Sequence, residues 1–217
     1  MAGIKGGKSG IRELFKRLLT WRVGVQWYAF ALFSTALVAA CAMGLYPLFS
    51  GESIEIDLLK QLGSLAGMLP IIIFLGGPVS EELGWRGFAL PKLLSRHSAL
   101  AASLIVGVMW GLWHLPAFWI AGAGQHDQSV LWFMIGSPAV AILYTWVYNH
   151  TKGSLLIAIL YHTAFDSTLY VALPAFSTAE ELRLAFALTV GLLWVLAIII
   201  VAVYGPQHLS GRMQSRT

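Results

Sequence analysis

The sequence predicts an all-α membrane protein, a bundle of about six transmembrane helices around an internal polar cavity. Of its 217 residues, 58% are hydrophobic and only 11% are charged, and the mean hydropathy is +0.73. A soluble domain of this length carries roughly 25% charged residues, so this chain cannot cover itself with a hydrated surface. Its apolar runs approach the ~20 residues that one bilayer crossing needs. These observations exclude a soluble enzyme and a disordered chain, and the single cysteine excludes a disulfide scaffold.

Six apolar segments separated by polar breaks are the predicted crossings. They cover residues 23–49, 58–80, 99–121, 130–148, 153–172 and 184–204. The break after the second segment differs from the others, because residues 81–97 are amphipathic and charged. We expect this stretch to continue the second helix, kinked at Pro78 and bent at Pro91, since proline interrupts helical hydrogen bonding. Residues Ile11–Trp21 are expected to form a short amphipathic helix on the membrane surface.

Positive charge is distributed unequally between the two sides of this arrangement. Twelve of the 14 lysine and arginine residues fall on the side of the termini, and only Lys60 and Arg183 fall on the other. Positive loops resist translocation, so both termini are predicted to be cytoplasmic. The expected location of the protein is the plasma membrane. In the N-terminal stretch, Arg12, Lys16 and Arg17 are expected to face lipid headgroups. The net charge of +4 is explained by these loops, so the bilayer is an expected partner and nucleic acid is not.

The chain is expected to form one membrane domain with two cytoplasmic flanks. The first flank, residues 1–22, is basic and amphipathic. The membrane domain covers residues 23–204, and the second flank is the tail, residues 205–217. A lipoprotein signal ending at Cys41 is an alternative for the N-terminus, but the apolar run continues past it and favours a retained helix. Gly63-x-x-x-Gly67 and Gly107-x-x-x-Gly111 predict faces where helices pack closely.

Ionisable side chains inside or beside the crossings are the candidate functional residues, because inserting a charge into hydrocarbon costs at least ~2.5–3.5 kcal/mol. They are Glu81, Glu82, Arg86, His114, His162 and Asp166. Three pairs are spaced four residues apart and so share a helix face: Glu82 with Arg86, Trp110 with His114, and His162 with Asp166. Glu81 points about 100° away from Glu82. We infer that three helices present these groups to one internal cavity that opens towards the cytoplasm.

Such a set of groups can activate water and hydrolyse an amide bond. Glu81 and neutral His114 are expected to hold a water molecule, with the carboxylate as general base. His162 and Asp166 are expected to polarise the scissile carbonyl and stabilise the oxyanion. A zinc site formed by Glu81, His114 and His162 is an alternative, and the spacing does not decide it because no HExxH motif is present.

The remaining candidates have supporting or structural roles. The pair Glu82 and Arg86 is expected to form a salt bridge that holds the helix in register and balances charge. His162 and Asp166 have a structural alternative as a hydrogen-bonded pair between helices. Four tryptophans, Trp85, Trp110, Trp113 and Trp119, are expected to line or roof the cavity or to lie at its interface. Trp85, Trp110 and Trp113 are the candidates for contact with substrate.

These residues fall into three motifs that resemble those of a known family. The run Glu81–Arg86 resembles the EExxxR motif of the CAAX prenyl protease and bacteriocin-processing family of intramembrane peptidases. Trp110–His114 is similar to its FxxxH motif, with Trp in place of Phe. His162–Asp166 is similar to its HxxxN/D motif, which follows a Gly-Ser-Leu turn, here at residues 153–155. The resemblance covers residues 64–172, about half of the chain.

The resemblance implies an intramembrane endopeptidase that cleaves a peptide or protein tail at the membrane. It puts Glu81 and His114 in the water-activating role, and His162 and Asp166 in the role of oxyanion stabilisers. Many members have Asn where this chain has Asp166, and a carboxylate repels an oxyanion unless it is protonated. Asp166 is therefore alternatively expected to orient His162. Some members trim prenylated proteins, so a lipidated substrate is one expectation, and the family leaves a divalent metal such as zinc undecided.

Two other functions are compatible with the same residues. The first is a catalytically inactive immunity or scaffold protein that keeps the bundle and binds a partner. The second is a proton-coupled transporter with Glu81, His114 and Asp166 as a relay. The transporter is disfavoured because such proteins often contain inverted repeats, and this sequence shows no internal repeat.

Overall fold

The structure, a computed structural model, describes residues 2–126 and 128–210, and these residues form a bundle of helices without strands. Six helical segments are long and apolar enough to cross a membrane. They are Val25–Ser50, Leu58–Leu94, Ala99–Trp119, Val130–His150, Leu155–Ala175 and Ala179–Tyr204. The predicted all-α membrane fold is confirmed, and the second segment continues through the charged stretch to Leu94 as expected.

Polar side chains mark where most of these helices begin. In chain order the elements are α1 (Ala2–Leu18), α2 (Val25–Ser50), α3 (Leu58–Phe74), α4 (Pro78–Gly84), the π-helix η1 (Trp85–Ala89), α5 (Leu90–Leu94), α6 (Ala99–His114), the 3-10 helix η2 (Leu115–Trp119), α7 (Val130–His150), α8 (Leu155–Ala172), the 3-10 helix η3 (Leu173–Ala175) and α9 (Ala179–Tyr204). Five helices start after a residue whose side chain accepts a backbone N–H of the first turn: Asp57, Ser98, Ser129, Ser154 and Thr178. These caps satisfy N–H groups that have no partner within the helix.

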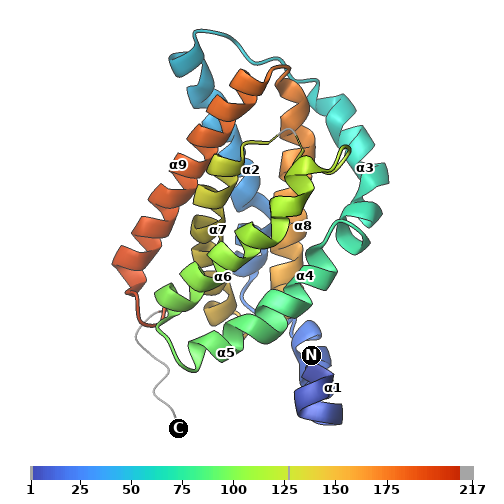
Figure 1. The fold of residues 1–217 in the computed structure, drawn as a ribbon, viewed down its shortest axis with the longest axis vertical. Helices are drawn as coiled ribbons and strands as arrows, with labels where there is room; N and C mark the ends of the chain where they lie inside the picture. Colours follow the sequence, from blue (N-terminus) through green and yellow to red (C-terminus); the bar gives the residue numbers. More distant parts are fainter. Residues whose placement is uncertain (1, 127, 211–217) are drawn as a thin grey trace.

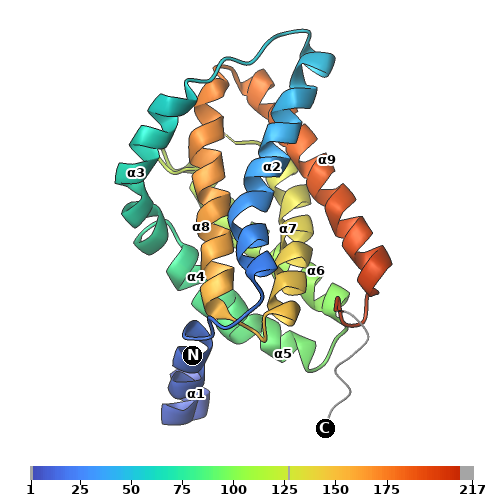
Figure 2. The same cartoon turned by 180° about the vertical axis from the view of Figure 1, so that it is seen from behind.

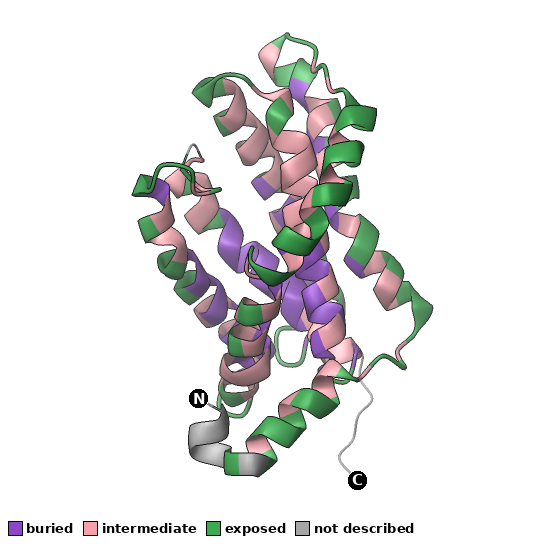
Figure 3. Cartoon of the chain, turned by 90° about the vertical axis from the view of Figure 1, so that its right-hand side faces the viewer, coloured by how far each residue is buried: buried purple, intermediate pink, exposed green. Residues whose placement is uncertain are grey.

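Helices α7 and α8 form the centre of the bundle (Figures 1 and 2). Helices α6 and α9 pack on α7, while α2, α3 and α4 pack on α8. Every residue of α7 from 136 to 145 is buried, and the buried residues gather in the middle of the bundle (Figure 3). The residues that carry the second and third motifs therefore lie on helices that face this core.

The two ends of the bundle differ in which connections they carry. Helix α2 begins and α9 ends at one end, which we call the basal end, and the α5–α6 and α7–α8 connections lie there too (Figure 1). The α2–α3 and α8–α9 connections lie at the opposite, distal end. This alternation agrees with six crossings. Arg212 and Arg216 of the tail lie outside the described residues, and the cytoplasmic position of the basal end stays a prediction.

The second crossing is built from two helices rather than the single kinked helix that the sequence predicts. Helix α3 ends at Phe74, and Gly77 then adopts a φ of 117°, a conformation that favours glycine. Pro78 occupies the first turn of α4 and so starts a helix instead of kinking one. Proline is tolerated there because its missing N–H would have had no helical partner. The continuous stretch of α4, η1 and α5 leaves α3 at an angle (Figure 1).

The N-terminal helix also differs from the expectation. It runs from Ala2 to Leu18 with a break at Gly7, whereas the sequence predicted Ile11–Trp21. Arg12 and Lys16 are exposed, as a helix at a membrane surface requires. Arg17 does not face headgroups: it is partly buried against the bundle, where it donates hydrogen bonds to backbone carbonyls.

Of the two predicted glycine faces, only one is a packing face. A Cβ atom on Gly107 would lie 2.5 Å from the Cα of Pro138 in α7, so the glycine permits the close approach of α6 and α7. The prediction for Gly63 and Gly67 is wrong, because both are exposed and a Cβ there would meet nothing within 4 Å. Spacing alone could not distinguish the two pairs, since it does not say which side of a helix faces protein.

Candidate active site

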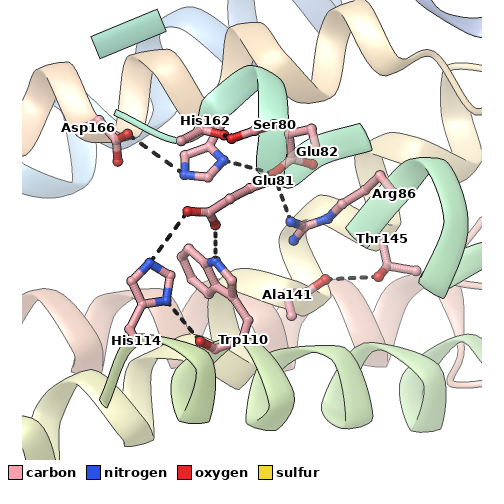
Figure 4. Close-up of polar contacts among 11 residues, drawn as sticks. Ser80, Glu81, Glu82, Arg86, Trp110, His114, Ala141, Thr145, His162 and Asp166 are labelled. Atoms are coloured by element: carbon pink, nitrogen blue, oxygen red, sulfur yellow. Dashed lines mark hydrogen bonds and ion pairs between the residues drawn. The ribbon is translucent and has the colours of Figure 1, made fainter. Parts of the chain in front are cut away.

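The six predicted ionisable residues meet in one place (Figure 4). Glu81, Glu82 and Arg86 come from α4 and η1, His114 from the end of α6, and His162 and Asp166 from α8. A cavity of about 340 Å³ adjoins them, and the polar residues that line it are Glu81, His114, Gln125, Gln128, His162, Asp166 and Tyr170. The structure therefore brings together every ionisable residue that the sequence assigned to the site.

Glu81 is placed by the break that precedes α4. A Cβ on Gly77 would lie only 2.6 Å from Oε1 of Glu81, so the carboxylate folds back over the glycine. Its Oε2 accepts a hydrogen bond of 2.6 Å from Nε1 of Trp110 on α6. Its Oε1 lies 3.7 Å from Nε2 of His114. That separation exceeds the usual hydrogen-bond range of about 2.7–3.2 Å, so the two groups face one another without bonding.

The hydrogen bonding of His114 determines which nitrogen faces Glu81. Its Nδ1 lies 2.8 Å from the carbonyl oxygen of Trp110, which can only accept, so Nδ1 carries the proton. In the neutral ring, Nε2 is then an acceptor, and so is the carboxylate of Glu81. Two acceptors 3.7 Å apart do not bond each other, but one water molecule can donate an O–H to each. The geometry fits the predicted activation of water.

Glu82 is the centre of a buried ionic network. Its Oε1 accepts 2.8 Å hydrogen bonds from Nη1 of Arg86 and from Nδ1 of His162, and all three residues are at most 3% exposed. The predicted pairing of Glu82 with Arg86 is present in the structure. The contact with His162, from a helix 80 residues later, had no signal in the sequence, because helical periodicity relates only residues of one helix. Glu82 thus orients the His162 ring.

Asp166 lies on the other side of His162, at the cavity. Its Oδ2 is 3.8 Å from Nε2 of His162, beyond hydrogen-bond distance. The expectation that Asp166 orients His162 is therefore not what the geometry favours, since Glu82 holds the opposite nitrogen. The sequence also missed Tyr144, whose ring lies 4.0 Å from the guanidinium carbon of Arg86 in a cation–π contact. Tyr144 sits within an apolar run of α7 and gave no signal.

The tryptophans expected to contact substrate behave differently from one another. Trp110 lines the cavity and bonds Glu81, whereas Trp85 packs against the hydrophobic core and does not line the cavity. Trp113 is 67% exposed and does not line the cavity, which leaves the alternative position at its interface. Gln125 and Gln128, in the α6–α7 connection, line the cavity instead, and neither belongs to a recognisable motif.

The residues proposed for a metal do not form a recognisable ligand set. Within the described part of the chain, no group of three or more His, Cys, Asp or Glu residues is arranged to hold a metal ion, and this applies to Glu81, His114 and His162. The Nδ1 atom of each histidine is already engaged, by the Trp110 carbonyl and by Glu82.

The cavity extends away from the basal end. Besides the catalytic candidates, its lining includes Gln125 and Gln128 of the α6–α7 connection and Leu173 of η3, which follows the distal end of α8. The sequence predicted an opening on the same side as the termini. This lining reaches residues on the distal side of the catalytic candidates, so it does not support the predicted opening on the side of the termini.

Comparison with known proteins gives the same family as the motifs. Residues 63–168 match the family model described as type II CAAX prenyl endopeptidase Rce1-like. This segment, rather than the whole chain, is similar to the Rce1-like family. A curated relative, CAAX prenyl protease 2 of Methanococcus maripaludis, is 35% identical over 88 residues, which cover 38% of this chain and 32% of that protein. The matched segment thus spans about a third of the relative's length. The Rce1-like segment contains all six ionisable site residues, and α1, α2 and α9 lie outside it.

Proposed function

We propose that this protein is an intramembrane endopeptidase that cleaves a peptide or protein tail at the membrane. The observation that carries the proposal is the pair of acceptors, Oε1 of Glu81 and Nε2 of His114, 3.7 Å apart at the cavity. The Rce1-like match of the surrounding core supports it. Against a purely structural role, Oε1 of Glu81 and Nε2 of His114 face each other at the cavity without bonding each other.

In the proposed reaction, water lies between Glu81 and His114 and attacks the scissile carbonyl. Glu81 takes the proton of the water as general base and later delivers a proton to the leaving amine. The hydrogen bond from Trp110 keeps the carboxylate aimed at the water. The developing oxyanion needs a donor, and Nε2 of His162 is the candidate.

For His162 to donate from Nε2, the ring must carry protons on both nitrogens, because Nδ1 already donates to Glu82. The imidazolium charge would be balanced by Glu82 on one side and by Asp166 on the other. Arg86 in turn holds the Glu82 carboxylate in place. In this arrangement Asp166 is a nearby counter-charge rather than a hydrogen-bond partner.

The reaction is tested by comparing membrane-derived peptides and new protein termini from cells that express either the wild type or Glu81→Gln at equal levels. Removal of a general base costs typically 10²–10⁴-fold in rate, so the products should disappear. Glu55→Gln, an exposed acidic position in the α2–α3 connection, is the matched control and should retain them. Identical peptide profiles for the wild type and Glu81→Gln would favour the inactive scaffold.

We further propose that substrate reaches the site from the non-cytoplasmic side. The charge distribution supports a cytoplasmic basal end, and the cavity lining reaches Gln125 and Gln128 on the distal side of the site. Labelling of Gln125→Cys in a Cys41→Ser background by a membrane-impermeant thiol reagent tests this in intact cells. Labelling only after the membrane is opened would place the cavity on the cytoplasmic side instead. A lipid on the substrate remains a prediction of the family resemblance.

A further inference from the structure

Arg17, in the last turn of α1, is inserted between the π-helix η1 and the turn that connects α7 to α8. Its guanidinium donates to three backbone carbonyls and one hydroxyl: Arg86 at 2.6 Å, Gly87 at 3.1 Å, Gly153 at 3.1 Å and the Tyr148 hydroxyl at 2.7 Å. The Arg17 guanidinium also lies 5.2 Å from the centre of the Tyr148 ring. Every guanidinium nitrogen of Arg17 is therefore engaged by the bundle.

The two carbonyls of η1 need donors from outside their own helix. In a regular α-helix the carbonyl of Arg86 would accept from the N–H of Leu90. In η1 that N–H is bonded to the carbonyl of Trp85 instead. The α-helical partner of the Gly87 carbonyl would be residue 91, which is Pro91 and has no N–H. The guanidinium thus supplies the donors that the π-helical register and the proline remove.

Packing around Arg17 holds the end of α1 against the same elements. A Cβ on Gly87 would lie 2.9 Å from Cδ2 of Leu14, so α1 touches η1 directly. On the other side, the hydroxyl of Ser154 donates a 2.6 Å hydrogen bond to the carbonyl of Thr20. Residues 14–20 are therefore docked on the bundle, although the exposed face of α1 is that of a surface helix.

The backbone that Arg17 holds is the backbone from which the site network starts. The carbonyl of Arg86 accepts from Arg17, and the side chain of Arg86 bonds Glu82, which bonds His162. We propose that Arg17 is a positioning residue: it sets the π-helical register of η1 and thereby the orientation of Glu82 and His162. The inference rests on the proposed peptidase function, and it assigns a role in catalysis to the N-terminal segment, which the Rce1-like match does not include.

Because the guanidinium of Arg17 is planar and bonds from all three nitrogens, we expect substitutions at this position to differ in effect. A lysine at position 17 keeps the charge but donates from one nitrogen instead of three spread in a plane, so it should reproduce fewer of the four hydrogen bonds of Arg17. Arg17→Gln removes the charge as well. Arg12→Gln is the matched control, because Arg12 lies exposed on the same helix and its loss changes the net charge equally.

Two measurements on the detergent-solubilised full chain test the proposal. Amide hydrogen exchange of residues 85–90 should accelerate in Arg17→Gln, less in Arg17→Lys, and stay unchanged in Arg12→Gln. The ¹⁵N signal of the His162 imidazole, assigned from its loss in His162→Asn, should shift in the same order, because the Glu82 bond to Nδ1 is weakened. With a cleaved peptide in hand, kcat of Arg17→Gln should fall about 10–100-fold, the usual loss for a partner of a catalytic group, with KM changed little.

The outcomes separate this proposal from the proposed function. Wild-type exchange in η1 and a wild-type His162 signal in Arg17→Gln would overturn the role of Arg17, even if the protein cleaves peptides. The expected changes in exchange and signal would support the role even if no peptide is cleaved. Equal effects of Arg12→Gln and Arg17→Gln would also overturn the proposal, because charge alone would then explain both. If Arg17→Gln does not fold, the comparison of Arg17→Lys with Arg12→Gln decides in the same way.

Discussion

The buried network of Glu82, Arg86 and His162 allows a quantitative prediction. Glu82→Gln keeps the shape of the side chain but removes the negative charge that accepts both 2.8 Å hydrogen bonds. Arg86 is 1% exposed and its neighbours include the ring of Tyr144, so no solvent replaces the lost carboxylate. The substitution therefore leaves a buried cation without its counter-charge.

The magnitude follows from that uncompensated charge. Removing one partner of a buried ion pair costs about 3–5 kcal/mol. For chains of 150–250 residues, 1 kcal/mol shifts the midpoint of thermal unfolding by about 2–4 °C, so Glu82→Gln should lower it by roughly 6–20 °C. Arg86→Met should cost a similar amount, because it leaves the buried Glu82 carboxylate without its arginine partner. The double variant should cost no more than either single one, since both charges are then gone.

Thermal unfolding of the four proteins in one detergent, at one pH, measures this cycle. Glu55→Gln serves as a control for the loss of an exposed acid and should change the midpoint little. Strictly additive losses in the double variant would refute the reasoning, because they would mean that Glu82 and Arg86 stabilise the bundle independently. A loss of unfolding free energy below about 1 kcal/mol for Glu82→Gln would also refute it, because only a solvent-exposed ion pair contributes so little.

Two other predictions concern close packing and the second carboxylate at His162. Gly107→Ala should destabilise the bundle by about 1–3 kcal/mol, because the new Cβ would lie 2.5 Å from the Cα of Pro138. Gly63→Ala, where a Cβ meets nothing, should be neutral or stabilising by up to about 1 kcal/mol. Equal midpoints of thermal unfolding for the two variants would contradict this prediction. Asp166→Asn should reduce peptide hydrolysis less than about tenfold, since no hydrogen bond joins it to His162, whereas His162→Asn should cost about 10²-fold or more. Equal losses of hydrolysis in these two variants would assign Asp166 a direct part in the reaction.

The fold class and the membership of the site follow from the sequence. Composition and apolar run lengths determine a membrane bundle because the bilayer requires a minimum length of apolar helix, whatever the tertiary packing. The cost of a buried charge then selects Glu81, His114 and His162 as candidates before any contact is known. Spacing of four residues correctly predicts the Glu82–Arg86 pair, since both lie along one continuous helical stretch.

The tertiary structure decided everything that depends on which helix faces which. Two contacts join residues far apart in the chain: the hydrogen bond between Glu82 and His162, and the hydrogen bonds of Arg17 to η1. The difference between Gly63 and Gly107 likewise depends on which neighbouring helix each one faces. Helical periodicity reports the face on which a residue lies, but it does not report what packs against that face. Local rules failed within one crossing too: Pro78 starts a helix because Gly77 before it turns the chain, and only the backbone path reveals that turn.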